Sequence, residues 1–487
     1  MKFANAPKTI SFNDLKNHIN KSFSPSDHTS IAVNSKFEYL DKFILKITYG
    51  KEVGGLNYVE PSKYKFIRTK CLQFDSILLH LEEAIGINPL MFKQFHLSRG
   101  DVLIVKDSNV GEVCYLDEDL PEFSISGGIV KINLNDKLDR YYIIGIMKSS
   151  FFKEQIDLMT PKGATIKHSK DSFKRTKIPV PSNKVCQKIS VLTQSLIKKE
   201  RELRHKFQSI NAKIEEELRN NLSGKKFSHK PLTYKDLLKY NRFDTGLYTA
   251  KFKEIEHLID NYKNGSDTIT NLGFYSIRGQ NLQISQIGKS LYADSLKPTF
   301  YKLFLPTNIT IYGTLKKLLF IGNSKQLLLV DKEDIIFGAE GFEKGRSFIP
   351  LKESGKFITN IHGTMLRNDS APVYKKIFIK CMLDWFREKG VIDAYSVGGN
   401  GGSFSTKYWK ILRFPIFEDE NQKEIAKLYY NPDDSYLNHI LKIDLKSYKE
   451  IDAAVTEKSG ILDLDAQIKA IKEIIDNEIK KMITLRS

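Results

Sequence analysis

Apolar residues between Pro181 and Leu222 recur at intervals of mostly three and four residues, which aligns them in one narrow stripe along a helix. About 40 residues at roughly 1.5 Å per residue give a rod of about 60 Å, and its other faces are charged. Ser182 is suited to cap this helix, and Ser223-Gly224 to end it. So narrow a stripe requires a partner helix. The stripe consists of Val185, Ile189, Leu192, Leu196, Leu203, Phe207, Ile210, Ile214 and Leu218.

The C-terminal tail repeats this pattern and is the predicted partner of the central helix. Both stripes are narrow, and each helix follows a proline-containing element at the end of a globular segment. We therefore predict an antiparallel coiled coil; the alternative is that each helix packs only on its own domain. The apolar positions of the tail are Ile461, Leu464, Ile468, Ile471, Ile475, Met482 and Leu485.

The rest of the chain alternates short β-branched runs with helical periodicity, which predicts an α+β fold. One helix is expected in each half, from Asp139 to Met159 and from Pro372 to Lys389. The predicted strands are Val102–Val105, Val110–Tyr115, Gly128–Leu134, Leu318–Ile321, Gln326–Leu329 and Phe357–Asn360.

The two halves carry similar segments in the same order, which indicates an internal duplication. The first pair is offset by 210 residues and the second by 233, so about 23 extra residues are expected near 298–330 in the second copy. Gly111 is also echoed by Gly345. The matching pairs are Phe66–Gln73 with Ser276–Gln283, Gly100–Val105 with Glu333–Gly338, and Phe173–Pro179 with Trp409–Pro415.

These patterns divide the chain into two globular units and two helical regions. The first unit covers residues 1–180 and the central helix 181–223. The second unit covers 224–415, and the C-terminal helical region covers 416–487. Residues 431–460 have no counterpart in the first half, so they are expected to interrupt the second helix.

Composition points to a basic protein of a reducing compartment. The 487 residues include 76 Lys plus Arg and 58 Asp plus Glu, a formal net charge of +18, which favours a polyanionic partner such as nucleic acid. The four cysteines form no CxxC pair, so neither disulfides nor a zinc site is expected. The N-terminal residues lack the apolar core of an export signal, and no run is apolar enough to span a membrane. A soluble, cytoplasmic protein is predicted.

Few residues of the chain are arranged for catalysis. The best candidate for a magnesium-dependent nuclease is the set Asp334, Glu340, Glu343 and Lys344, whose loose spacing also fits a solvated turn. The glycine-rich segment 398–403 opens no βαβ unit, so a flexible loop is preferred to a phosphate cradle. His362 is assigned a structural role rather than a DNA contact, and no metal site is expected.

DNA recognition needs only basic residues for phosphates and polar side chains on loops for base edges. Both halves offer such residues in corresponding loops, although each one alone could be an ordinary surface residue. The candidates in the first half are Lys106, Ser108, Asn109, Lys162, Thr165, Lys167 and Lys170. Those in the second half are Arg278, Lys344, Arg346, Asn400, Ser403, Ser405 and Lys407.

The order of these segments resembles the specificity subunits of type I restriction-modification systems, or of the related type IIB systems. The resemblance covers essentially the whole chain and rests on Ile67-Arg68 with Ile277-Arg278, on the strand opening Gly100–Leu103, and on Thr176–Pro181 leading into the central helix. Two departures are the loss of the second proline at Phe417 and the interruption at 431–460, which leave type I and type IIB partners both open.

The resemblance implies a non-catalytic subunit for phage defence with two target-recognition domains, each reading half of a split DNA sequence. Two methyltransferase subunits carrying S-adenosylmethionine would dock on it and modify adenine. In type I systems a translocase-nuclease subunit that uses ATP and Mg²⁺ would join them. Alternatives from other classes are a self-sufficient nuclease and a protein scaffold that does not bind DNA.

Overall fold

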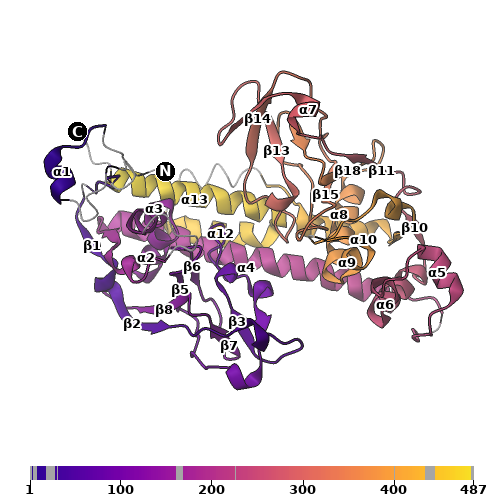
Figure 1. Cartoon of the computed structure of the whole chain (residues 1–487), viewed down its shortest axis with the longest axis horizontal. Coiled ribbons are helices and arrows are strands. Elements are labelled where there is room, and N and C mark those ends of the chain that lie inside the picture. The colour runs from indigo at the N-terminus through magenta and orange to yellow at the C-terminus, as the bar shows by residue number, and fades with distance from the viewer. Residues whose placement is uncertain are drawn as a thin grey trace. The chain divides into compact units, whose positions relative to one another are not determined.

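The computed structural model divides the chain into two compact units. Unit 1 comprises residues 1–202, 434–457 and 466–487, and unit 2 comprises residues 203–433 and 458–465. The structure describes residues 3, 8–17, 23, 28–29, 31–33, 35–160, 168–224, 226–399, 401–433 and 445–483. Over these residues the chain is a mixed α/β protein, as expected (Figure 1). No helix among them is long and apolar enough to cross a membrane.

Unit 1 contains a four-stranded antiparallel sheet of order β2-β8-β5-β6. Its strands are β2 (Ile44–Tyr49), β8 (Ile129–Leu134), β5 (Val102–Val105) and β6 (Val113–Tyr115). Every residue of β5 is buried, so this strand shows no apolar-polar alternation. A three-stranded sheet of order β4-β3-β7 lies beside it in the fold, with β3 (Lys65–Ile67) parallel to β7 (Phe123–Ile125) and antiparallel to β4 (Ile85–Gly86).

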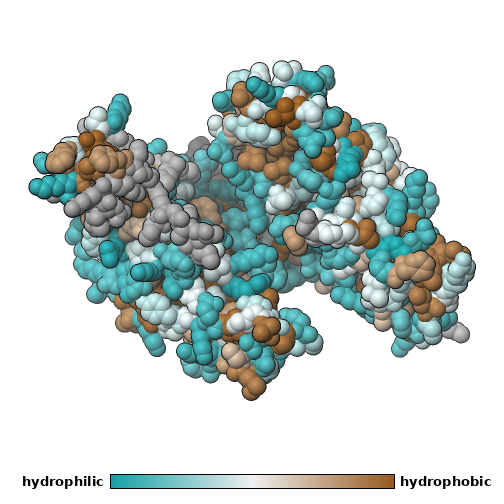
Figure 2. Space-filling view, viewed as in Figure 1, coloured by the Kyte–Doolittle hydropathy of each residue, from teal (hydrophilic) through white to brown (hydrophobic). Residues whose placement is uncertain are grey.

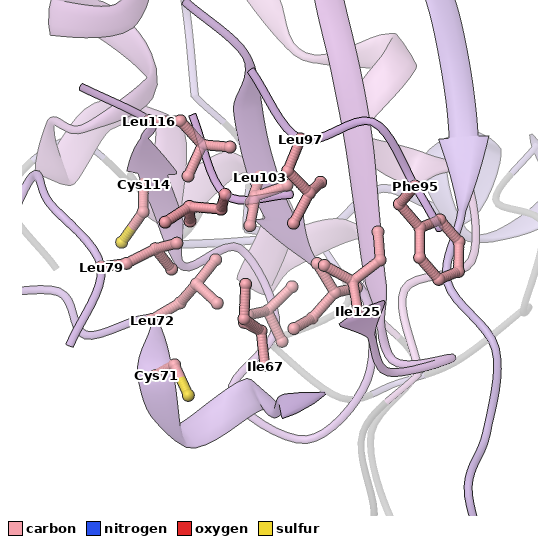
Figure 3. Close-up of a cluster of buried hydrophobic side chains, with 13 residues drawn as sticks. Ile67, Cys71, Leu72, Leu79, Phe95, Leu97, Leu103, Cys114, Leu116 and Ile125 are labelled. Carbon is pink, nitrogen blue, oxygen red and sulfur yellow. The ribbon is translucent and has the colours of Figure 1, made fainter. Parts of the chain in front are cut away.

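Side chains from both sheets and their connections form the main core of unit 1 (Figure 3). Leu103 and Cys114 come from β5 and β6, while Ile67 and Ile125 come from the parallel pair. Burial of these apolar surfaces is the principal stabilising term for such a unit. The full cluster is Ile67, Cys71, Leu72, Leu79, Phe95, Leu97, Leu103, Val105, Cys114, Leu116, Leu120, Ile125 and Ile129.

Two helices follow the sheets of unit 1, where the sequence predicted one. They are α2 (Arg140–Met147) and α3 (Ser150–Met159). The predicted continuous helix is wrong because the Ser149 side chain accepts a hydrogen bond from the Phe152 amide and starts a new helix there. Earlier in the chain lie α1 (Phe12–Asn17) and β1 (Phe37–Tyr39), and β1 pairs with β9 (Lys177–Pro179) at the end of the unit.

Unit 2 contains two four-stranded sheets. One has the order β11-β18-β15-β16 and is antiparallel; its strands are β11 (Tyr275–Arg278), β18 (Gly363–Arg367), β15 (Ile335–Gly338) and β16 (Ser347–Phe348). The other has the order β12-β14-β13-β17, with strands β12 (Ser290–Ala293), β14 (Leu319–Asn323), β13 (Tyr301–Phe304) and β17 (Phe357–Thr359). Its pair β13-β17 is parallel. No strand forms at Gln326–Leu329, so that prediction is wrong.

The helices of unit 2 are mostly short. They are α5 (Tyr234–Tyr240), α6 (Ala250–Asp260), α7 (Ile284–Ile287), α8 (Val373–Glu388), α9 (Val391–Tyr395) and α10 (Asp419–Tyr429). Helix α8 confirms the prediction for Pro372–Lys389 and is buried along most of its length. Strand β10 (Ser266–Thr268) pairs with β19 (Arg413–Pro415), so the sheet-bearing part of this unit begins and ends in paired strands, as β1 and β9 do in unit 1.

Two long helices carry the predicted apolar stripes, α4 (Asn183–Asn220) and α13 (Ile461–Ile483), and a third helix, α12 (Leu445–Lys458), lies within the predicted interruption at 431–460. Within unit 1, Lys188 forms an ion pair with Glu478, and Lys199 donates to Gln467, so α4 and this part of α13 run in opposite directions. Most of the stripe is buried, while Val185 and Met482 are half-buried. The buried positions are Ile189, Leu192, Leu196, Leu203, Phe207, Ile210, Ile214, Leu218, Ile461, Leu464, Ile468, Ile471 and Ile475, and Leu485 lies outside the described residues.

The strand pairings correct the first of the three sequence matches. Ile67 lies in β3, which pairs in parallel with β7, whereas Ile277 lies in β11, which pairs antiparallel with β18. The strand that shares the pairing of β11 is β2. A short mixed run of apolar and basic residues is compatible with many strands. The similarity of these two segments therefore does not mean that they occupy the same position in the two units.

The expected insertion of about 23 residues is wrong as a consequence. Gly50 and Gly279 both follow the edge strand and donate to the partner strand, to Ile129 at 3.0 Å and to Gly363 at 2.9 Å. Counted from these glycines, the segment ending at Asp334 is only four residues longer than the one ending at Asp101. The matches at Asp101 and Asp334, at Gly111 and Gly345, and at β9 and β19 do fall at equivalent places.

Candidate DNA interface

In each unit, a buried aspartate holds the turn that leads into the central strand, β5 in unit 1 and β15 in unit 2. The Asp101 carboxylate accepts the Ser98 amide at 2.9 Å, and the Asp334 carboxylate accepts the Asp331 amide at 2.7 Å. The preceding residue has a left-handed conformation in both cases, with φ 101° at Gly100 and 76° at Glu333. Each turn therefore fixes where β5 or β15 begins, and with it the loop at the far end of the strand.

Both aspartates are also held by the adjacent strand. Asp101 pairs with Lys131 of β8 at 3.0 Å, and Asp334 pairs with Arg367 of β18 at 2.6 Å. Burial raises the pKa of Asp334, and its bonds to Arg367 oppose that rise. Asp334 is thus a structural residue of the sheet.

The loop that follows β5 in unit 1 is organised around Asp107. Its carboxylate contacts the Lys106 ammonium at 3.0 Å and Nδ1 of His168 at 2.7 Å. His168 is about half exposed, with 56% of its side chain accessible. Ser108 and Asn109 at the tip are exposed, and Ser108 has φ 74°. Acidic, basic and amide groups therefore meet solvent together at this tip.

The loop that follows β15 in unit 2 is organised in the same way around Glu340. Its carboxylate contacts Nη2 of Arg278 at 2.6 Å and Nδ1 of His362 at 2.5 Å. The Arg278 side chain is 59% exposed, and its Nε donates to the Ile361 carbonyl at 3.0 Å. Two of its five N–H donors are thus used to orient the guanidinium, and the others face outward from a fixed fork.

In each unit a second loop is fastened to the first. The Ser169 amide donates to the Lys106 carbonyl at 2.8 Å, and the Phe404 amide donates to the Ala339 carbonyl at 2.7 Å. Single antiparallel bridges join Asp107 to His168 and Glu340 to Ser403. The fastened loops thus present side chains from two distant segments at one edge of each sheet, which is a suitable arrangement for contacting base edges.

The structure brings some of the predicted DNA-contacting residues to these loops. Ser108, Asn109, Lys170, Arg278 and Lys407 are exposed there or nearby, while Lys106, Ser403 and Ser405 are half-buried. The interpretation of these residues as DNA contacts stays a prediction. Lys162, Thr165, Lys167 and Asn400 lie outside the described residues.

Lys344 and Arg346 have structural partners instead. The Lys344 ammonium contacts Asp393 at 2.5 Å and is 10% exposed. The Arg346 guanidinium is buried, donates to the Ile309 carbonyl at 2.9 Å and pairs with Glu343. Their placement supports the packing of unit 2 rather than contact with a phosphate.

The four residues of the nuclease alternative do not converge. Asp334 binds Arg367, Glu343 binds Arg346, Glu340 binds Arg278, and Lys344 binds Asp393. Across the ranges that the structure describes, no group of three or more His, Cys, Asp or Glu side chains is arranged to hold a metal ion. A two-carboxylate magnesium site is therefore not supported.

Sequence reasoning missed Asp107 and His168, and it singled out Glu340 only as a candidate magnesium ligand. Asp107 and Glu340 each follow the central strand by two residues, so their shared position could have been read from the Asp101 and Asp334 match. His168 lies 61 residues from Asp107 along the chain, and no local pattern connects them. His362 was assigned a structural role, and its bond to Glu340 agrees with that, although 51% of its side chain is exposed.

Polar loops fastened to each other at the end of a sheet, in a chain with a formal net charge of +18, are an arrangement suited to DNA recognition. Residues 50–216 match the family model described as the type I restriction modification DNA specificity domain. The resemblance inferred from the sequence is thereby confirmed, and this stretch includes every strand of the two sheets of unit 1 except β2, together with most of α4. The match supports a DNA-recognition subunit of a restriction-modification system, and the nuclease and scaffold alternatives are not supported.

Several solved structures share the chain's extent at low identity. The S subunit of a type I restriction-modification system from M. genitalium is 14% identical, with 93% of this chain and 97% of that one covered and a TM-score of 0.37. The HsdS subunit from Thermoanaerobacter tengcongensis is 13% identical, with 92% and 96% covered and a TM-score of 0.28. No curated protein matches the chain. The matched domain is one of DNA specificity, and DNA together with methyltransferase or restriction subunits are the partners it implies.

Proposed function

We propose that this chain reads a bipartite DNA sequence with two duplicated target-recognition domains, one for each half-site. The observation that carries the proposal is the recurrence of one sheet, β2-β8-β5-β6, as β11-β18-β15-β16. The same buried aspartate enters the central strand of both, and an acidic centre follows it in both. Because the family match falls on the first copy, we assign the second copy the same role, the reading of the other DNA half-site.

Recognition in each half rests on the fastened loops. Lys170 and Lys407 are suited to phosphates, which set register and affinity without sequence information. Arg278 is suited to a guanine edge, Asn109 to an adenine edge, and the carboxylates of Asp107 and Glu340 to the amino group of cytosine. The histidines hold these carboxylates in place.

The helices α4 and α13 form an antiparallel coiled coil that fixes the distance between the half-sites. Support comes from their narrow buried stripes and from the opposed order of their ion pairs in unit 1. The loops and helices also dock two methyltransferase subunits, which extrude and methylate adenine in DNA. Restriction subunits join them in a type I complex.

The chain itself is non-catalytic in this scheme and acts in the cytoplasm in defence against phage. S-adenosylmethionine is bound by the methyltransferase subunits, and ATP with Mg²⁺ by a translocase subunit where one is present. The carboxylates described above are engaged by Arg and Lys partners, which supports placing the chemistry outside this chain.

The test is methylation mapping by sequencing in cells that express this chain with its neighbouring methyltransferase, against cells that lack this chain. A split adenine motif that appears only with the chain is the expected result. If an active, bound methyltransferase produces no chain-dependent motif, the proposal fails.

A further inference from the structure

Phe342 is exposed at the tip of the loop that follows β15. Its side chain is 87% accessible, the most exposed phenylalanine among the described residues. It lies two residues beyond Glu340, the acidic centre that holds Arg278 and His362. Hydrophilic side chains cover much of the face shown in Figure 2. At 87% exposure, the Phe342 ring packs little against the rest of the chain.

The backbone that carries Phe342 is fixed by close contact with the second loop. The Gly341 amide donates to the Gly402 carbonyl at 3.0 Å, and the Gly345 amide donates to the Gly338 carbonyl at 2.7 Å. A Cβ at Gly401 would lie 2.5 Å from the Phe342 nitrogen, so only glycine permits this approach. Gly341 and Gly401 both have positive φ, 88° and 87°. The ring is therefore presented from a closely packed pair of loops.

The corresponding loop of unit 1 lacks this ring. The segment from Gly338 to Gly345 is one residue longer than that from Val105 to Gly111. The left-handed residue, Gly341 or Ser108, occurs three residues beyond the strand in both loops. It is followed by Phe342 in unit 2 and by the polar Asn109 in unit 1. The extra length and the aromatic side chain thus distinguish the second recognition loop from the first.

We infer that Phe342 is a wedge that inserts between bases of the half-site read by unit 2. The inference rests on the proposed function and adds to it a residue that distorts the DNA. Apolar side chains, phenylalanine among them, partly unstack base steps in proteins that kink the duplex. Arg278 and the nearby Lys407 supply the cationic surroundings that bring phosphates and base edges to the loop.

The test uses the full chain bound to its methyltransferase subunits and duplexes that carry the motif found by methylation mapping. 2-Aminopurine is placed in turn at each position of both half-sites, and its fluorescence and the affinity of each duplex are measured. Phe342→Ala and Phe342→Trp are compared with Tyr292→Ala, an exposed aromatic on β12, which is separated from β17 by two strands.

Apart from the adenines that the methyltransferase subunits extrude, the wild-type complex should raise the fluorescence at one base step of one half-site. Phe342→Ala should abolish that signal and weaken binding roughly 5- to 150-fold, the range measured for loss of an aromatic-base stack. Phe342→Trp should keep both, and Tyr292→Ala should change neither.

The inference is overturned if Phe342→Ala leaves affinity and fluorescence unchanged, or lowers affinity while the fluorescence change persists. An equal loss in Tyr292→Ala would also overturn it. Because the motif must exist before the duplexes can be made, failure of the wedge is distinguishable from failure of the proposed function.

Discussion

Removal of the Lys199 ammonium should destabilise the helices of unit 1. Lys199 is fully buried and contacts Asp452 at 2.9 Å, Thr456 at 2.8 Å and Gln467 at 2.7 Å. Asp452 also accepts the Ser195 hydroxyl at 3.0 Å, and its side chain is 6% exposed. Lys199→Met leaves a buried carboxylate without its cation, which typically costs about 3–5 kcal/mol.

Replacing Asp452 as well should reverse the loss of stability caused by Lys199→Met. In Lys199→Met with Asp452→Leu no buried charge remains, so most of the loss should be recovered; such replacements are often neutral or stabilising by about 1–4 kcal/mol. Hydrogen–deuterium exchange of the α12 amides measures the local opening free energy in all four proteins of the cycle. The reasoning is refuted if the α12 amides of Lys199→Met exchange as slowly as those of wild type, or if those of the double variant exchange faster than those of Lys199→Met.

The same pair gives a pH dependence of known sign. Burial lowers the pKa of Lys199 to about 8, against its ordinary value near 10.5, and Asp452 opposes that shift. The folded state thus binds fewer protons than the unfolded state between these values, so wild-type stability should rise as pH increases from about 8 to 10.5. The rise is at most about 3 kcal/mol and should be absent in the double variant. Exchange rates corrected for intrinsic pH effects measure the difference, and parallel profiles for the two proteins would contradict it.

Three further predictions concern DNA recognition and the sheets. Seven residues inserted at matched places in α4 and α13 add two helical turns, about 10 Å, and should lengthen the DNA spacer by about three base pairs with both half-sites unchanged. Methylation mapping measures the spacer, and an unchanged spacer would refute the proposal that the helices fix the distance between half-sites. Lys407→Ala and Lys170→Ala should each lower the slope of log affinity against log salt by about 1 without changing the motif, while a changed motif would show base reading instead. Asp334→Ala should destabilise unit 2 by about 1–3 kcal/mol, because Arg367 loses its buried partner and keeps only the more exposed Asp331, with a smaller effect on unit 1 in hydrogen exchange; equal losses in both units would contradict this.

The long helices and the central strands could be predicted because their signals are local. The stripe from Val185 to Leu218 shows a period that only a helix explains, and α4 spans it. Strand β5 is short, apolar and bounded by a turn, so its existence was readable although its burial on both faces was not. The break between α2 and α3 was missed because a single capping serine overrides a continuous apolar pattern.

The candidate interface was less predictable because it joins residues far apart in the chain. Arg278 was selected from sequence, but its partner Glu340 lies 62 residues away and reaches it only through the β11-β18-β15 pairing. Arg346 and Lys344 looked available for DNA because charge and loop position are local properties, whereas their partners are set by the fold. The misplaced match of Ile67 with Ile277 has the same cause, because the direction in which a strand pairs cannot be read from so short a segment.

The pairing of β1 with β9, and of β10 with β19, places the entry and exit of each unit side by side. Phe37 pairs with Pro179, and Ser266 pairs with Pro415. In each unit, the segment between the two paired strands therefore leaves from and returns to the same two-stranded ribbon. A genetic exchange that cuts at these ribbons would replace a whole recognition module and leave the helical sequences untouched. Each half could then acquire a new target in one step, and the two halves could diversify independently.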